Sequence, residues 1–173
     1  MELRLAKAMM TAALAAFCLL VAYDNLVDYE TNYAFVRHVL SMDTTFPGNA
    51  LMHRAITDER GWRMAYAAII AGEAVSGLFL ALGAVAMLAR LAAPAARFER
   101  AKRFVYLGGT LAFLVWFFGF MVVAGEYFAM WQSKDWNGQA AAFRFSMTVL
   151  GVLILVALPE REIADTEPPT QPR

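Results

Sequence analysis

Long apolar runs alternate with short polar segments along the chain, and four of these runs are long enough to cross a lipid bilayer. They fall at about residues 5–27, 62–89, 104–128 and 139–158. A helix needs about 20 mostly apolar residues to span the hydrocarbon core. The pattern therefore predicts an all-α, polytopic membrane protein built as a four-transmembrane-helix bundle.

The polar segment after the first run, residues 28–60, has a helical pattern of its own. Apolar residues recur at helical spacing within NYAFVRHVLSM, and Pro47-Gly48 then signals a turn. We expect this segment to form a short helical cap on the outer side of the membrane. Residues 1–158 then make one transmembrane domain. The polar, proline-rich residues 159–173 are expected to be a disordered cytoplasmic tail.

Basic residues assign an orientation to the four predicted spans. The loop between the second and third spans contains the single acid Glu99 and a set of basic residues: Arg90, Arg97, Arg100, Lys102 and Arg103. Since short loops rich in Lys and Arg stay in the cytoplasm, this loop and both termini are predicted to be cytoplasmic. We expect the first run to remain as an uncleaved helix, because a signal-peptide cut after Ala22 would require a small residue where Leu20 stands.

The composition agrees with a membrane protein and gives few signs of chemistry. The chain is 60% hydrophobic and only 17% charged, whereas an ordinary soluble domain is about 25% charged. The formal net charge of zero argues against a nucleic-acid partner. The two histidines, His38 and His53, both lie in the polar segment without a third ligand at a metal-binding spacing. We therefore expect no metal, no cofactor, no catalytic residue and no enzymatic activity.

Three ionisable residues interrupt the apolar runs and are the candidate functional residues. Glu73 lies 11 residues after Trp62, which places it about 16 Å deep at about 1.5 Å per residue, near the bilayer midplane. Glu126 and Arg144 lie at similar depths on either side of a short loop, and we expect them to form an ion pair. With Asp24, at the outer end of the first helix, these residues make up the expected intramembrane polar cluster.

The helix faces predict that these charges point into the bundle. Glu73 shares its face with small residues such as Ser76, a composition typical of helix–helix contacts. Glu126 ends a seam with 4-3-4-3-4 spacing on the third helix, and Arg144 lies on the stripe of the fourth helix that contains Gly151. A compact bundle with a polar interior in its outer half is the expected result.

Two segments carry a resemblance to a known family. They are DNLVDYETNYAFVRHVLSMDTTFPGNALMHRAI, residues 24–56, and GEYFAMWQSKDWNGQAAAFRF, residues 125–145. Both resemble the signatures of a bacterial family of predicted small integral membrane proteins, a domain of unknown function. The resemblance extends from the first helix to Leu158. It implies four spans in a bacterial inner (plasma) membrane and implies no activity.

Three functions remain open at this point. The first is a structural or accessory subunit that docks on a membrane complex or self-associates, so the expected partners are the lipid bilayer and a membrane protein or a second copy of the chain. The second is a small oligomeric transporter or channel that uses Glu73. The third is a membrane anchor that binds quinone or haem, although neither histidine lies in a predicted span. For Glu73 itself the alternatives are a proton or cation relay, a ligand contact, and a purely structural buried carboxyl.

Overall fold

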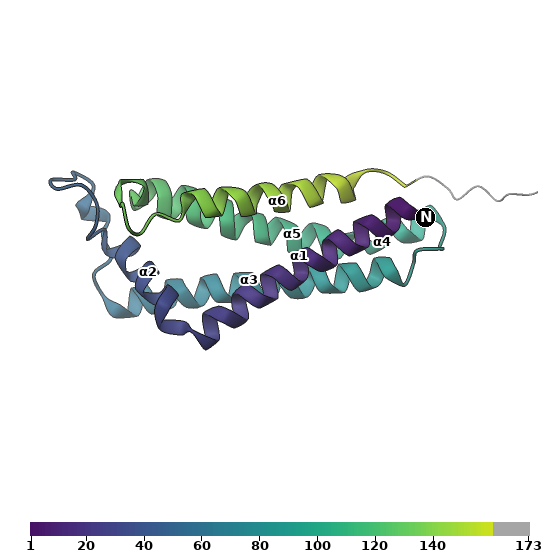
Figure 1. The fold of residues 1–173 in the computed structure, drawn as a ribbon, viewed down its shortest axis with the longest axis horizontal. Helices are drawn as coiled ribbons and strands as arrows, with labels where there is room; N and C mark the ends of the chain where they lie inside the picture. Colours follow the sequence, from purple (N-terminus) through teal and green to yellow (C-terminus); the bar gives the residue numbers. More distant parts are fainter. Residues whose placement is uncertain (161–173) are drawn as a thin grey trace, which may run out of the picture.

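The computed structural model describes residues 1–160, and these form a bundle of four long helices (Figure 1). The four helices are long and apolar enough to cross a membrane. They are α1 (Glu2–Val27), α3 (Glu59–Leu88), a third span made of α4 (Ala95–Ala101), α5 (Arg103–Phe113) and η2 (Leu114–Tyr127), and α6 (Gln139–Ala157). The predicted four-helix membrane bundle is confirmed.

The two ends of the bundle differ in what they contain. The terminal end holds the N-terminus, α4 and the end of α6, while the cap end holds α2 (Tyr29–Ser41), η1 (Met52–Arg54) and η3 (Met130–Gln132) (Figure 1). The predicted cap segment therefore does contain helices, while its position on the outer side of the membrane stays a prediction. Of the predicted tail, residues 161–173 lie outside the described part. Glu160, the second residue of that predicted tail, is described and contacts buried cations at the terminal end.

Polar contacts at the cap end determine where α3 begins. The Asp58 side chain caps the helix, since its Oδ1 accepts a hydrogen bond from the backbone N–H of Gly61 at 2.8 Å. The Trp62 indole donates to the Ile56 carbonyl at 2.7 Å and ties the first turn to the cap. The helix thus begins at Glu59, three residues before the start of the predicted apolar span at about residue 62. The predicted turn contains Gly48 at a φ of +78°, which glycine adopts readily.

Small residues bring the backbones of the helices close together. A Cβ atom added to Gly77 would lie 2.7 Å from a side-chain carbon of Leu19, so α3 and α1 touch there. A Cβ atom on Gly108 would lie 2.8 Å from the backbone nitrogen of Leu80 and from the carbonyl of Ser76. Membrane helices pack through such small residues because lipid supplies no hydrophobic force to drive them together.

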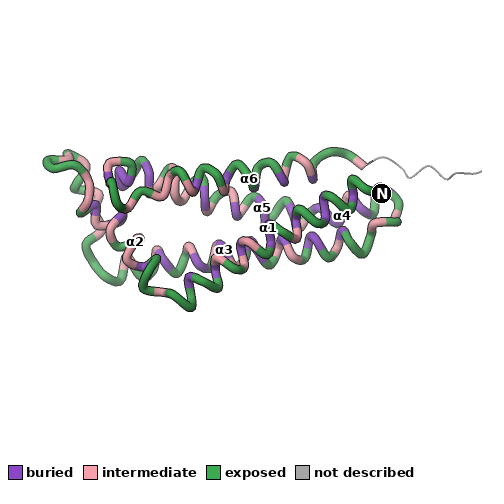
Figure 2. Tube along the Cα trace, viewed as in Figure 1, coloured by how far each residue is buried: buried purple, intermediate pink, exposed green. Residues whose placement is uncertain are grey.

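Two apolar clusters stabilise the bundle, and buried positions line the inner faces of the helices (Figure 2). The first cluster fills the terminal half and includes Leu80, Phe98 and Val149. The second lies beneath the cap and includes Tyr66 and Ile70. On α3, the residues between Ile70 and Leu80 therefore pass from one cluster to the other.

The third span changes its hydrogen-bonding pattern halfway along. α5 is an α-helix, whereas η2 is a π-helix of 14 residues, with bonds from each residue to the fifth one along. The wider turn shifts which positions face inward. The inner face passes from Gly108 and Ala112 to Trp116 and then Gly125. π-Type turns occur mostly as single-turn bulges and often lie at functional sites. The residues that face this longer π-helix are therefore candidates for a functional site.

Candidate functional site

Glu73 is buried near the middle of α3 and ends a chain of side-chain amides. Only 2% of the surface of this residue is exposed to solvent. The Asn25 amide of α1 donates a hydrogen bond to Glu73 Oε2 at 2.8 Å, and the Asn32 amide of α2 donates to Asn25 Oδ1 at 2.6 Å. The Tyr66 hydroxyl donates to the Asn25 backbone carbonyl at 3.1 Å. The chain of donors therefore runs from the cap toward the Glu73 carboxyl.

The Glu73 carboxyl has no cationic partner within residues 1–160. No ion pair involves it, and Asn25 supplies its one hydrogen bond, to Oε2. A carboxyl group at membrane depth normally pairs with a cation or faces a polar cavity, because leaving it alone is costly. The other oxygen, Oε1, accepts no hydrogen bond from residues 1–160.

A pocket of about 210 Å³ lies beside this carboxyl. Its polar lining comes from Glu73 and the three residues that hydrogen-bond around it: Asn25, Asn32 and Tyr66. Its walls are apolar and include Phe35, Trp116 and Phe120. A mostly apolar hollow with a few convergent polar groups is the usual form of a small-molecule site.

The break between α1 and α2 places two amides over Glu73. α1 ends at Val27 and α2 leaves in a new direction from Tyr29 (Figure 1), which returns Asn32 over Asn25. The Tyr29 ring packs on that of Tyr66, with ring centroids 4.7 Å apart. This aromatic contact fixes the cap relative to α3 and so orients the amides.

The predicted polar cluster is not formed, and only Glu73 of its four members is buried. Asp24, Glu126 and Arg144 are all exposed. Asn25 takes the place expected of Asp24, because the next residue of an α-helix lies about 100° farther around the axis. The expected Glu126–Arg144 ion pair is wrong, since no such contact within 4.0 Å exists in the described chain.

The π-helix explains why Glu126 points outward. The predicted seam assumed an α-helical period throughout the third span. Because η2 has a longer period, Gly125 is buried in its place and the next residue, Glu126, is turned away. Similar depth in the membrane does not make two residues face each other.

Arg144 lies on the outer face of α6 for a different reason. The inner face of α6 is formed by five small or β-branched residues: Ala142, Ser146, Val149, Val152 and Val156. The predicted stripe through Gly151 instead faces outward, and a Cβ atom on Gly151 would meet nothing within 4 Å. Arg144 lies five residues into α6, so its long side chain can extend to the cap-end interface.

Several residues of the pocket were not predicted from the sequence. Asn25 continues a buried series with Cys18 and Ala22 at 4-3 spacing, and this series is a signal that the sequence does contain. Trp116 and Phe120 gave no comparable signal, because aromatic residues in an apolar span are equally suited to lipid. Glu73 itself was predicted to face the interior, and the structure buries it.

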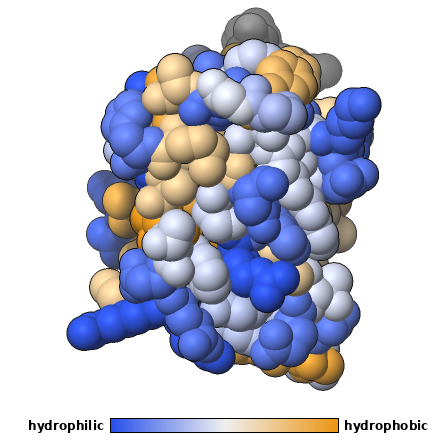
Figure 3. Space-filling model, turned by 90° about the vertical axis from the view of Figure 1, so that its left-hand side faces the viewer, coloured by the Kyte–Doolittle hydropathy of each residue, from blue (hydrophilic) through white to orange (hydrophobic). Residues whose placement is uncertain are grey.

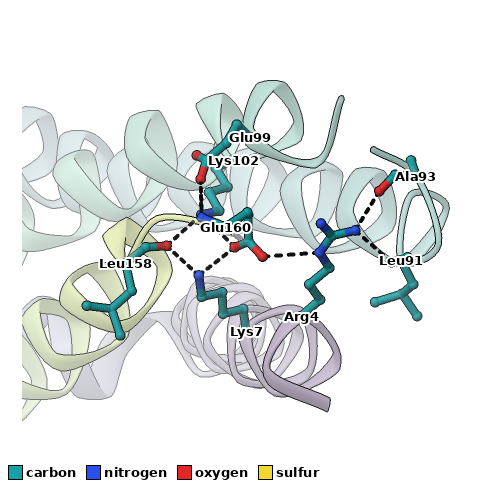
Figure 4. A network of polar contacts seen from close by, with 8 residues as sticks. All are labelled: Arg4, Lys7, Leu91, Ala93, Glu99, Lys102, Leu158 and Glu160. Atoms are coloured by element: carbon teal, nitrogen blue, oxygen red, sulfur yellow. Dashed lines mark hydrogen bonds and ion pairs between the residues drawn. The ribbon is translucent and has the colours of Figure 1, made fainter. Parts of the chain in front are cut away.

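A second polar cluster ties the terminal end together (Figure 4). The Glu160 carboxylate lies among the side chains of three cations: 3.1 Å from Arg4 Nε, 2.8 Å from Lys102 Nζ and in contact with Lys7 Nζ. Lys7 and Lys102 also donate to the carbonyl of Leu158, just past the end of α6. Positive charge at a helix C-terminus stabilises the helix dipole.

The cluster around Glu160 is internally satisfied and has a structural role. Burial raises the pKa of Glu160, but hydrogen bonds from Lys102 and Lys7 outweigh it and hold the pKa below its usual value. The three cations and the carboxylate therefore form a clasp that joins α1, the junction between α4 and α5, and the residues just after α6. Unlike Glu73, this carboxylate has three charged partners among the described residues.

Comparison with known proteins gives a family but no described activity. The model of a family described as "Predicted small integral membrane protein (DUF2165)" matches residues 3–159. Neither the curated proteins nor the solved structures contain a match. The matched residues include all four spans, the cap and every residue that lines the Glu73 pocket.

Proposed function

Because the chain belongs to this family of predicted small integral membrane proteins, whose description names no activity, we propose a function from the pocket itself. The protein binds a small organic amine or another compact cation beside Glu73, within the membrane. The observation that carries this proposal is the Glu73 carboxyl. Its residue is 2% exposed and lines a pocket, and none of residues 1–160 places a cation beside it.

The direction of the hydrogen bonds favours a ligand that donates. Asn32 donates to Asn25, and Asn25 donates to Glu73. The oxygen left without a partner is an acceptor, Glu73 Oε1. An ammonium group supplies both hydrogen-bond donors and the positive charge that the carboxylate lacks. A quinone offers only carbonyl acceptors, so its oxygens would face the ionised Glu73 carboxylate with no hydrogen between the two acceptors.

The pocket walls suit an organic cation better than a bare metal ion. Aromatic rings attract cations through their faces, and the Phe35 and Phe120 rings lie beside each other with centroids 6.2 Å apart. The volume of about 210 Å³ is below the range of drug-sized sites, about 300–1,000 Å³. The ligand is therefore compact, with an apolar part that contacts the rings.

Titration of the purified protein with small amines tests this proposal. Methylamine and benzylamine serve as probes, because both carry ammonium N–H donors, and Trp116 supplies a fluorophore in the pocket wall. We expect saturable binding that Glu73→Gln weakens at least about tenfold, equivalent to about 1.4 kcal/mol. Glu126→Gln is the matched control, because it removes an exposed carboxylate from a membrane helix. Absence of saturable binding, or equal binding by Glu73→Gln, would contradict the proposal.

An accessory role is the second candidate, supported by an exposed apolar patch on the cap. The Phe46 and Trp131 rings meet edge to face with centroids 5.8 Å apart, and both residues are about half exposed. Hydrophobic side chains gather on part of this otherwise polar end (Figure 3). We infer that this patch contacts a membrane-protein partner. Co-purification of one partner from native membranes, lost in Phe46→Ser but retained in Arg60→Gln, tests the role.

A further inference from the structure

A hollow lined by arginines opens at the terminal end, between the end of α3 and the start of the third span. It has a volume of about 650 Å³. Four exposed arginines line it: Arg90, Arg97, Arg100 and Arg103. Much of the rest of the lining is alanine, such as Ala89 and Ala93, so little side-chain bulk fills the space between the guanidinium groups.

The positive charge of this hollow is not neutralised within the described residues. Among residues 1–160, no carboxylate lies within 4.0 Å of any of the four guanidinium groups. The acid of the same loop, Glu99, is turned toward the clasp, where its Oε1 accepts hydrogen bonds from Lys102 Nζ and from the backbone N–H of Glu160, both at 2.9 Å. The clasp cations are thus paired, and within residues 1–160 no acidic side chain neutralises the four arginines that line the hollow.

An apolar groove leads from this hollow along α5. It has a volume of about 470 Å³, shares Arg103 with the hollow, and continues past Tyr106 and Leu107 to Leu114. Leu114 lies 11 residues after Arg103, a distance of about 16 Å along the helix at about 1.5 Å per residue. This length is about half of the 30 Å hydrocarbon core, which is the depth that one lipid leaflet fills.

We propose that the hollow and the groove together bind one anionic phospholipid. The guanidinium groups receive the phosphate through paired N–H donors, a geometry for which arginine is better suited than lysine. An acyl chain lies along α5 in the apolar groove. A free phosphate would use the hollow alone, whereas a lipid uses both parts. The site is independent of the Glu73 pocket, which lies toward the cap end.

Lipid titration of the detergent-solubilised full chain, followed by native mass spectrometry, tests this site. The probes are short-chain phosphatidylglycerol, phosphatidylcholine with the same chains, and glycerol 3-phosphate. We expect phosphatidylglycerol to bind about tenfold more tightly than either other probe. The double variant Arg97→Gln/Arg100→Gln weakens it about 30-fold, since each basic residue near an anionic lipid contributes roughly a fivefold factor.

Two further variants separate the lipid site from a general effect of charge. Arg60→Gln/Lys134→Gln removes two exposed basic residues at the other end of the molecule and should leave lipid binding unchanged. Leu107→Trp fills the groove and should weaken phosphatidylglycerol but not glycerol 3-phosphate. The lipid site is excluded if glycerol 3-phosphate binds as tightly as the lipid, if phosphatidylcholine binds equally, or if the control pair loses as much affinity as the arginine pair.

Discussion

Asp24 and Asn25 are neighbours at the end of α1, yet only Asn25 reaches the Glu73 pocket. Asn25 is 5% exposed and both donates to Glu73 and accepts from Asn32. Asp24 faces outward. At the scale of single residues, the make-up of the pocket thus depends on helical phase more than on charge, because a rotation of about 100° per residue decides which side chain is buried.

Replacing Asn25 tests the amide chain directly. In Asn25→Ala, Glu73 Oε2 loses its donor and the Asn32 amide loses its acceptor. An unsatisfied buried polar group costs about 1–3 kcal/mol, so we expect a loss of this size in the free energy of unfolding, measured by denaturation in detergent. Asp24→Ala is the control and should stay within about 0.5 kcal/mol of the parent. Equal effects at both positions would contradict the assigned contacts.

The sequence predicts that Glu73 is buried but does not predict which residues surround it. A single carboxyl in an apolar run is expected to face the bundle interior, because exposing it to lipid costs free energy. The partners of that carboxyl are set by how α1 and α2 meet, a tertiary feature that the hydrophobic pattern does not contain. Asn32 is one polar residue in a polar segment, and nothing local distinguishes it from its neighbours.

At the scale of helices, the number and extent of the spans follow from hydropathy, while their facing sides do not. The predicted seam of the third span holds at Gly108 and Ala112 and is lost where η2 begins. A π-helix depends on tertiary packing and has no simple sequence signature. The predicted inward stripe of α6 is wrong. It placed a small residue, Gly151, and a charged residue, Arg144, toward the interior, whereas both face outward.

Two glycine substitutions separate a packing glycine from an exposed one. Gly108→Ala forces a methyl group to within 2.8 Å of the α3 backbone, and overpacking of this kind costs about 1–3 kcal/mol. Gly151→Ala meets open space and should be neutral or stabilise α6 by up to about 1 kcal/mol, because alanine is the better helix former. Thermal denaturation of both variants provides the comparison. If Gly108→Ala is as stable as Gly151→Ala, the close contact of α3 with α5 does not exist.

The clasp around Glu160 predicts a loss of stability on acidification. The pKa of Glu160 is lower in the folded protein than its ordinary value of 4.5, so the ionised carboxylate stabilises the fold above that pH. Its contribution should disappear as the pH falls below 4.5 and through the lower pKa of the folded state. Glu160→Gln should lower the free energy of unfolding by about 3 kcal/mol at pH 7, because buried cations lose their partner.

The pH series needs a control at a second acid. Glu59 forms an exposed ion pair with Arg63 at 2.6 Å, and such pairs contribute little. Glu59→Gln should therefore keep the acid transition of the parent protein, while Glu160→Gln should show a weaker one. A transition that is unchanged in Glu160→Gln would show that the clasp does not control it.

At the scale of the whole molecule, both described ends of the chain and the arginine hollow lie at one end. The contact of Arg4 with Glu160 brings the first turn of α1 to the residues after α6. Since arginine-rich loops remain in the cytoplasm, we expect this end to be cytoplasmic and the cap to lie outside. A reporter active only outside the cytoplasm should be inactive when fused after Arg173 and active when inserted near Asn49. The opposite pattern would reverse the topology.

The central claim is that a cation binds directly against the Glu73 carboxyl. Infrared difference spectroscopy of the protein in lipid, with and without benzylamine, tests it most directly because carboxyl bands report changes at that group. The account predicts a carboxyl difference signal that shifts on isotopic labelling of glutamate, disappears in Glu73→Gln and persists in Glu126→Gln. An unchanged signal in Glu73→Gln, or no carboxyl signal in the parent at saturating amine, would contradict it.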